Sequence, residues 1–239
     1  RLRSARGGSR REDHQALGKG VRLNLGKVAI LALGSHEERH GPALPPDTDA
    51  KLASHVASEA AKRTGARFIG VLYSSYELPG IDTGRHQSLD QVFEELRRTL
   101  LDAKRALGIG AAVLVNGHGG NEPLRERLPA LEKELSMPIV FNNTLIEIEG
   151  PHAATGELSM AAVIGIADVS KIAEQTDFER HPEVGFIGLK EARRRYAWAE
   201  RQAREVEKVG LRIDKFLGEK LLECAIVDVV NDVREIIRE

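Results

Sequence analysis

Short, uninterrupted runs of apolar residues recur along the chain and predict the strands of a parallel sheet. The first run, Val-Ala-Ile-Leu-Ala-Leu, occupies residues 28–33. No polar residue alternates within it, as expected of a strand that is buried on both faces. Similar runs at 68–73, at 111–115 and, after Pro138, at 139–141 predict three further strands.

Between these runs, apolar residues spaced three or four positions apart predict amphipathic helices that cover the sheet. The first helix is expected to end at Gly65, because glycine favours the conformation that closes a helix. Its apolar positions are Ala50, Ala53, Val56, Ala57 and Ala60. The second helix begins at a capping box formed by Ser88 and Gln91 and ends before Gly108.

The later part of the chain is predicted to be more helical. Asn121 is a candidate cap for a helix with one apolar stripe, formed by Leu124, Leu128, Leu131 and Leu135. Residues 157–167 and the highly charged stretch 190–209 are also expected to be helical, the latter as a solvated helix or a contact between subunits. The last helix has one apolar face, formed by Leu222, Ala225, Ile226, Val229, Val230 and Val233.

This alternation of strands and helices predicts an α/β fold with three layers, in which a mostly parallel sheet carries helices on both faces. The chain has 239 residues, and we expect residues 23–239 to form one domain. In such folds ligands bind beyond the carboxyl ends of the strands. The loops that follow the strands are therefore the first places to search for chemistry.

Composition narrows the class of protein. The chain is 41% hydrophobic and 30% charged, which excludes collagen-like and wholly disordered proteins. Its single cysteine, Cys224, cannot form an intramolecular disulfide, so we expect a reducing cytoplasmic environment. No apolar run approaches the roughly 18 residues of a membrane-spanning helix, and we expect a soluble protein that does not bind membranes.

The charge of the chain is concentrated at its beginning. Residues 1–22 contain seven basic and two acidic side chains, a net charge of +5, whereas the remaining residues carry −6. Without an apolar core or helical periodicity, this segment is expected to be a disordered basic leader. A nucleic-acid-binding arm is the alternative, but nothing further along resembles a nucleic-acid module.

Potential metal ligands gather in the loop after the first predicted strand. Glu38 and His40 are two positions apart, so in an extended segment their side chains project to the same side. Gly-Pro and Pro-Pro pairs stiffen the loop, and Asp49 follows at the start of the next helix. If the loop is shifted by one residue, Glu37 takes the place of Glu38.

A second glycine-rich loop, Asn-Gly-His-Gly-Gly-Asn, follows the third predicted strand and contains His118. If the two strands are near neighbours, His118 converges with Glu38, His40 and Asp49. Two carboxylates and two imidazoles without a thiolate suit zinc, ferrous iron or manganese. A carboxylate such as Asp49 can bridge two ions. Taken singly, each residue is more often an ordinary loop side chain, and only their joint placement favours a metal centre.

A third segment contributes a candidate proton carrier. His152 is the candidate catalytic residue, because the ordinary pKa of histidine is about 6.5. Glu157 either completes the shell of a second metal ion or simply favours the dipole at the start of a helix. Glu147 and Glu149 alternate with apolar residues and are expected on the exposed face of a strand.

The pair Arg85 and His86 follows the second predicted strand. These two residues are candidates for binding a substrate phosphate, since charged hydrogen bonds to phosphate are strong. Ordinary surface charges would look the same in the sequence.

Taken together, these segments resemble the creatininase-like metal-dependent amidohydrolases. The shared pattern is Gly-Ser, Glu38-x-His40-Gly-Pro-x-Leu-Pro, Thr48-Asp49, Asn-Gly-His118-Gly-Gly-Asn and the segment 152–157. The likeness covers roughly residues 28–165. Within the family, the amino-acid sequences of the first loop and of residues 141–160 are most similar to those of archaeal deformylases of flavin and deazaflavin biosynthesis.

The resemblance implies a creatininase-like fold and an enzyme that releases formate from a phosphorylated formamidopyrimidine substrate. It implies two divalent ions, with iron(II) favoured over zinc or manganese. It assigns Glu38, Asp49 and His118 to one ion and His40 with Asp49 to the other. A homo-oligomer is also implied, with a dimer favoured and a hexamer as in creatininase as the alternative.

The sequence departs from the family pattern at three places, which affects the site residues that the resemblance implies. The loop 34–40 is one residue longer than usual, Gly120 replaces a family glutamate, and His-Ala-Gly reads His152-Ala-Ala here. We therefore expect Glu157 to substitute for the missing glutamate and creatinine not to be the substrate. The alternatives are an amidohydrolase that acts on another small or cyclic amide and a non-catalytic, metal-stabilised binding protein.

Overall fold

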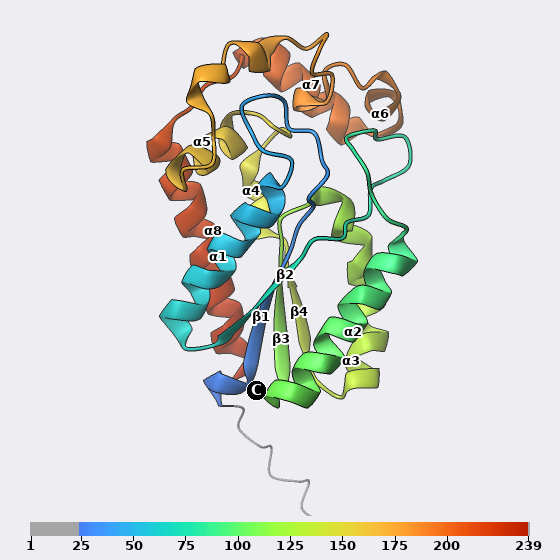
Figure 1. Cartoon of the computed structure of the whole chain (residues 1–239), viewed down its shortest axis with the longest axis vertical. Helices are drawn as coiled ribbons and strands as arrows, with labels where there is room; N and C mark the ends of the chain where they lie inside the picture. Colours follow the sequence, from blue (N-terminus) through green and yellow to red (C-terminus); the bar gives the residue numbers. More distant parts are fainter. Residues whose placement is uncertain (1–23, 239) are drawn as a thin grey trace, which may run out of the picture.

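A computed structural model describes residues 24–238, and the predicted basic leader lies outside the described residues. Within this range the chain forms a four-stranded parallel sheet with the order β2-β1-β3-β4 (Figure 1). The strands are β1 (Val28–Leu33), β2 (Arg67–Leu72), β3 (Ala111–Asn116) and β4 (Ile139–Asn142). Every residue of the two central strands, β1 and β3, is buried, as predicted from their unbroken apolar runs.

Eight α-helices and five short 3-10 helices accompany the sheet in the described part of the chain. The α-helices are α1 (Thr48–Thr64), α2 (Leu89–Leu107), α3 (Leu128–Leu135), α4 (Thr144–Glu149), α5 (Thr155–Val163), α6 (Lys190–Arg195), α7 (Ala197–Val209) and α8 (Lys215–Ile236). The 3-10 helices are Leu25–Lys27, Gly119–Arg127, Val169–Lys171, Glu174–Thr176 and Val184–Phe186. None of the helices between residues 24 and 238 is long and apolar enough to cross a membrane.

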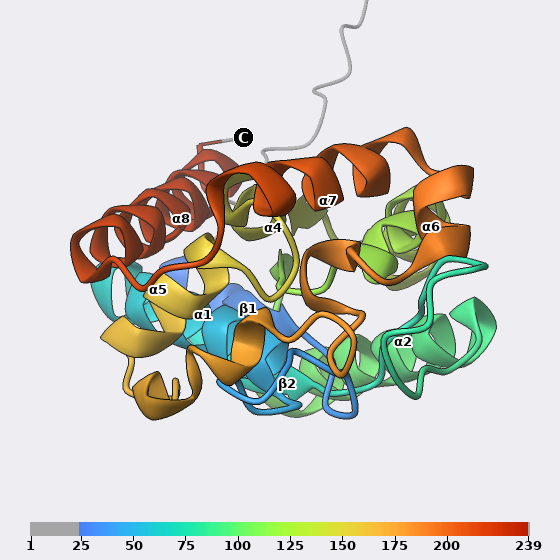
Figure 2. The same ribbon diagram turned by 90° about the horizontal axis from the view of Figure 1, so that it is seen from above.

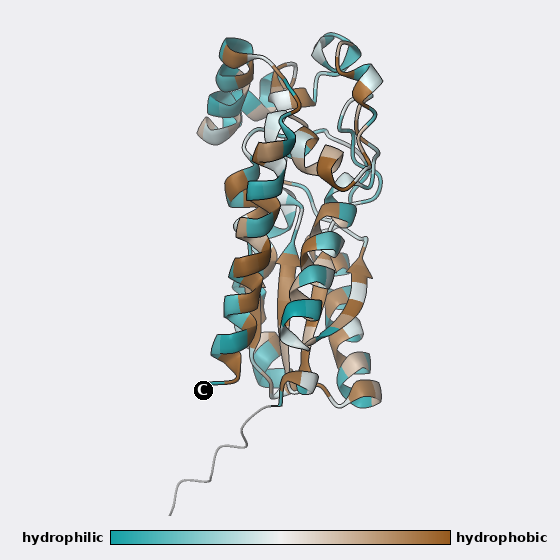
Figure 3. Ribbon diagram, turned by 90° about the vertical axis from the view of Figure 1, so that its left-hand side faces the viewer, coloured by the Kyte–Doolittle hydropathy of each residue, from teal (hydrophilic) through white to brown (hydrophobic). Residues whose placement is uncertain are grey.

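The helices cover both faces of the sheet and confirm the predicted three layers. Alternate residues of β1, Val28, Ile30 and Ala32, pack with α1 and α8 on one face. The intervening residues of β1 pack with α2 and α3 on the other face. The strands are largely hydrophobic, whereas the helices are hydrophobic mainly on one side (Figure 3). Each fully buried leucine or isoleucine in these layers contributes about 1.5–3 kcal/mol.

Helix ends follow the predicted signals. Gly65 and Gly108 close α1 and α2 with φ of 79° and 65°, in the left-handed region that favours glycine. Ser88 and Gln91 form both bonds of the capping box at the start of α2. The buried stripe of leucines in α3 and the apolar face of α8 are also confirmed.

Two local predictions were wrong. Asn121 caps no helix: it lies inside the 3-10 helix Gly119–Arg127, and its side-chain oxygen accepts a hydrogen bond from the Tyr76 backbone 3.0 Å away. Residues 144–149 form α4 rather than a strand. Their alternating pattern was too short to decide between the two, and packing of buried Leu145 within the α1 and α8 layer decided for a helix.

The chain crosses to different faces of the sheet after β1 and after β3. β1 and β3 pair directly from Val28 with Ala111 to Leu33 with Asn116, while α1 and α3 that follow them lie on opposite faces. The loops after these strands therefore separate above the carboxyl edge of the sheet, which is where doubly wound folds bind ligands. In Figures 1 and 2, α7 crosses above this edge.

Candidate metal centre

The loop between β1 and α1 is held in place from outside itself. The buried amide of Gln175 donates to the carbonyl oxygens of His40, at 2.7 Å, and Ala153, at 3.0 Å, and accepts from the Ala43 amide at 2.9 Å. Gly41 has φ of 71°, and a side chain there would collide with the Gln175 amide. A single glutamine thus ties the loop of His40 to the loop that carries His152.

Asp49 lies at the middle of the site, on the first turn of α1. One of its carboxylate oxygens, Oδ1, is 2.9 Å from His40 Nε2, and the other, Oδ2, is 3.0 Å from His118 Nδ1. The two imidazoles come from the loops after β1 and β3, so the predicted convergence of these loops takes place. Asp49 therefore lies between the two imidazoles, with one carboxylate oxygen toward each.

Each of the two imidazoles also has a second carboxylate beside it. Glu38 Oε2 is 2.7 Å from His118 Nδ1, and Glu157 Oε1 is 3.4 Å from His40 Nε2. Ser35 Oγ lies 2.8 Å from Glu38 Oε2 and 3.2 Å from Asp49 Oδ2, so its single hydroxyl proton can be donated to either carboxylate. We call Glu38, His40, Asp49, His118 and Glu157 the acidic cluster.

The structure distinguishes between the two adjacent glutamates of the first loop. The Glu38 side chain is 3% exposed and belongs to the acidic cluster, whereas that of Glu37 is 44% exposed. Glu37 faces His36, at 3.7 Å, and Arg85, at 3.7 Å, on the outer side of the loop. The extra residue of the loop therefore leaves Glu38 in position.

The loop before α5 brings Glu157 into the acidic cluster. Glu157 lies in the first turn of α5 and is buried, and its Oε2 accepts a hydrogen bond from the Ala153 backbone. Ala153 has φ of 52°, a conformation that costs a non-glycine residue about 1–2 kcal/mol. Such strain is typical of functional loops, and here it accompanies the hydrogen bond to Glu157.

The electrostatics of the acidic cluster couple its acids to its imidazoles. Burial alone would raise the pKa of Asp49, but the nearby imidazoles of His40 and His118 outweigh it and hold this pKa below its usual value. Burial would lower the pKa of both histidines, but the surrounding carboxylates raise it well above 6.5. The three carboxylates thus hold protons on the two imidazoles when nothing else neutralises them.

This donor set fits divalent cations. Side-chain exposure in the acidic cluster ranges from 0% to 6%, so its three carboxylates are shielded from water. Buried carboxylates at such short separation need a compensating positive charge. Imidazole nitrogen and carboxylate oxygen are ligands suited to zinc, iron(II) and manganese.

We expect metal binding to release close to two protons at pH 7. The pKa of His40 and of His118 is raised, so each imidazole holds a proton at neutral pH that a cation must displace. Raising the pH removes these protons and should therefore strengthen metal binding. Calorimetric titration in buffers of different ionisation enthalpy measures the release, and fewer than about one proton per protein would contradict this prediction.

His152 lies at the border between the acidic cluster and a cavity. Its Nε2 is 2.9 Å from the Arg39 carbonyl oxygen, and its Nδ1 is 3.8 Å from Glu38 and 3.9 Å from Glu157. A carbonyl oxygen only accepts, so Nε2 is the nitrogen that donates to Arg39, and Nδ1 faces the carboxylates. The ring lies between those of His40 and Phe186, with centroid distances of 4.6 and 5.3 Å.

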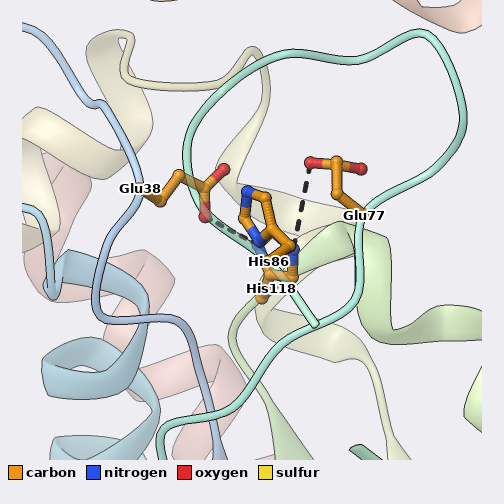
Figure 4. Close-up of side chains that lie close together, drawn as sticks. All are labelled: Glu38, Glu77, His86 and His118. Carbon is orange, nitrogen blue, oxygen red and sulfur yellow. Dashed lines mark ion pairs between the residues drawn. The ribbon is translucent and has the colours of Figure 1, made fainter. Parts of the chain in front are cut away.

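Glu77 is a member of the site that the sequence did not reveal. Figure 4 shows it facing His118 from the side opposite Glu38; its Oε2 is 3.9 Å from His118 Nε2. Burial raises its pKa. A side chain at Gly120, where the family glutamate is missing, would lie 2.9 Å from Glu77 Oε1 and 2.6 Å from His118 Nε2. Glu77 follows β2, whose carboxyl end lies at the same edge of the sheet as the acidic cluster. This position after a predicted strand was the feature of the sequence that could have indicated Glu77.

The two candidate phosphate-binding residues occupy different environments. His86 stacks on His118 with a centroid distance of 5.1 Å (Figure 4), and burial together with the neighbouring His118 lowers its pKa to about 4. Its two nitrogens face Ser75 and Thr83. The Arg85 side chain is 84% exposed and lies 3.7 Å from Glu37.

A cavity of about 490 Å³ opens directly onto the acidic cluster, within the range of small-molecule sites. Its walls include Glu38, Asp49, His118 and His152 on one side and Trp198, Arg201 and Gln202 of α7 on another. Arg85 is not part of its lining. The predicted alternatives for the stretch 190–209, a solvated helix or a subunit contact, missed this role of α7.

Residues 20–229 match the creatininase family, described as creatinine amidohydrolase. Because the match spans most of the chain, the protein belongs to the creatininase family, which confirms the resemblance predicted from its loops.

Individual relatives are more specific. The 2-amino-5-formylamino-6-ribosylaminopyrimidin-4(3H)-one 5'-monophosphate deformylase of Methanothermobacter thermautotrophicus is 49% identical over 213 residues, covering 89% of this chain and 90% of the relative. The protein of the same name from Methanothermobacter marburgensis is 50% identical over 212 residues, covering 88% and 91%.

Solved structures share the fold at low sequence identity. A crystal structure of creatinine amidohydrolase (creatininase) has a TM-score of 0.65 and 15% identity, covering 87% of this chain and 90% of that one. A structure described as "Creatininase Mn" has a TM-score of 0.64 and 15% identity, covering 88% and 91%. These neighbours confirm the predicted fold class.

Proposed function

We propose that this protein is a divalent-metal-dependent deformylase that hydrolyses the formamide of 2-amino-5-formylamino-6-ribosylaminopyrimidin-4(3H)-one 5'-monophosphate. Near 50% identity over almost the whole chain to two proteins of that name is the observation that carries this proposal. The acidic cluster beside a cavity of ligand size supports it.

Two ions, iron(II) by preference, would be held by the acidic cluster. Glu38 and His118 would bind one ion and His40 and Glu157 the other, with Asp49 shared between them. The distances from the two Asp49 oxygens to the two imidazoles support this division. When bound, divalent ions polarise a carbonyl group and favour ionisation of an attacking water.

His152 would move the proton. Its Nδ1 would accept a proton from the water as the water oxygen forms a bond to the formamide carbon, while Nε2 donates to the Arg39 carbonyl oxygen. Transfer of this proton to the leaving nitrogen would let the C–N bond break, which gives the free amine and formic acid, and the acid ionises to formate. Stacking on Phe186 and the tie through Gln175 hold the ring in place for both transfers.

Formate release from this substrate under anaerobic conditions tests the proposal. We expect protein stripped with EDTA to lose activity by more than about 1,000-fold, since metal ions supply several kcal/mol of transition-state stabilisation. Iron(II), zinc or manganese should restore it, and the order of restored rates identifies the preferred ion.

The same assay distinguishes the proposed deformylase from the alternative functions. Creatinine and other cyclic amides serve as comparison substrates for a different amidohydrolase activity. Formate release that survives complete metal removal would reject the metal mechanism. Absence of release from the metal-loaded protein would reject the deformylase.

A further inference from the structure

The cavity presents a problem for a phosphorylated substrate, because its wall is rich in carboxylates. The acidic residues of the lining are Glu38, Asp49, Glu77, Glu122, Glu147 and Glu149. A phosphate monoester carries close to two negative charges at neutral pH and is repelled by those carboxylates of the wall that are ionised; burial raises the pKa of Glu77 and Glu149, so these two contribute least. Bound cations would offset only the carboxylates nearest to them, so the phosphate needs a positive group elsewhere in the cavity.

Arg201 on α7 is the one lysine or arginine among the described residues that line this cavity. It follows Trp198 by three positions and precedes Gln202, so all three share one side of the helix and line the cavity together. The arginine guanidinium matches phosphate geometry with parallel hydrogen bonds.

The guanidinium of Arg201 is available for a ligand. Its neighbours on α6 and α7, Arg193 and Arg204, bind the Glu200 carboxylate at 2.7 and 2.6 Å. Between residues 24 and 238, the structure contains no ion pair or hydrogen bond of the Arg201 side chain, which is exposed. Its guanidinium donors can therefore bind an anionic group in the cavity without first breaking an ion pair.

The wall between Arg201 and the acidic cluster is aromatic. Trp198 meets Phe186 edge to face at 5.4 Å, and Phe186 stacks on His152. Gln202 accepts a hydrogen bond from the His152 backbone at 3.3 Å. A flat pyrimidine fits beside such aromatic faces. Its formamide would point toward the acidic cluster and its phosphate toward α7, which contributes residues to the cavity wall.

We propose that Arg201 binds the phosphate group of the substrate and that α7 thereby makes this protein specific for a phosphorylated formamidopyrimidine. The inference rests on the proposed function for the identity of the substrate. Arg85, by comparison, lies beside the Glu37 carboxylate and is absent from the cavity lining.

Kinetics with two substrates test this role. We expect Arg201→Met to lower kcat/KM for the phosphorylated substrate by about 100-fold, as expected for loss of a charged hydrogen-bonded pair. For the dephosphorylated nucleoside, kcat/KM should stay within about twofold of wild type, because no phosphate is present to be bound. Arg204→Met, on the same helix but outside the cavity, is the matched control and should change neither value by more than about twofold.

Ribose 5-phosphate provides a binding probe that needs no turnover. Wild-type protein and Arg204→Met should bind it, and Arg201→Met should bind it at least about tenfold more weakly. This measurement decides the role of Arg201 even if wild-type protein releases no formate, which would count only against the proposed function. Equal loss with both kinetic substrates, or unchanged affinity for ribose 5-phosphate in Arg201→Met, would overturn the proposal.

Discussion

Replacing Asp49 with asparagine should remove metal binding at both centres and lower formate release by about 10⁴-fold or more. Asp49 places one oxygen against each of two imidazoles, at 2.9 and 3.0 Å. Asparagine has nearly the same shape but only one acceptor oxygen and no charge, so it cannot serve both centres. Metal content after dialysis, measured by mass spectrometry, and formate release are the two readouts.

A neighbouring aspartate provides the control for this variant. Asp47 immediately precedes α1, and its partly exposed carboxylate binds Lys51 at 2.8 Å. Exposed pairs of this kind contribute only about 0–1 kcal/mol, so Asp47→Asn should keep its metal and its activity within about twofold. Wild-type metal content in Asp49→Asn would remove Asp49 from the centre.

The second large effect is expected for His152→Gln. Loss of a proton-transferring imidazole typically lowers kcat by 10²–10⁴-fold, and we expect a decrease of about 10³-fold with metal content unchanged. The separations of 3.8 and 3.9 Å between Nδ1 and the carboxylates of Glu38 and Glu157 place the ring beside the acidic cluster. Glutamine retains a polar side chain that can still donate to the Arg39 carbonyl oxygen.

Metal content and kcat, measured together, show whether His152 is a metal ligand or a proton carrier. If metal content falls in parallel with kcat, His152 is a ligand, and the proton carrier must be sought elsewhere. His55→Gln serves as the control, because His55 is half-buried on α1 and does not line the cavity. Both its metal content and its kcat should stay within about twofold of wild type.

Some features of the site could be predicted from local patterns in the sequence. Asp49 and His118 were predicted to meet because both follow buried parallel strands, whose carboxyl ends share one edge of a sheet. That inference used the apolar runs and the glycine-rich loops, but it also required the first and third predicted strands to be near neighbours. The structure supplies this condition, because β1 and β3 pair directly.

Other features could not be read from local patterns. The burial of Glu38 rather than Glu37 depends on how the loop is tied by Gln175, more than 130 residues further along the chain. Glu77 has no motif around it. Its carboxylate occupies space beside Gly120 that becomes visible only when the loops after β2 and β3 lie together.

The sequence by itself determined the layered α/β fold, the helix ends and the placement of acids and imidazoles in loops that follow buried strands. These depend on periodic burial and on the conformations of glycine and proline, which act over a few residues. Only the tertiary structure decided which residues line the cavity beside the acidic cluster. A charged helix such as α7 has the same pattern whether its polar face meets solvent or a cavity, so the position of Arg201 follows from packing between distant segments.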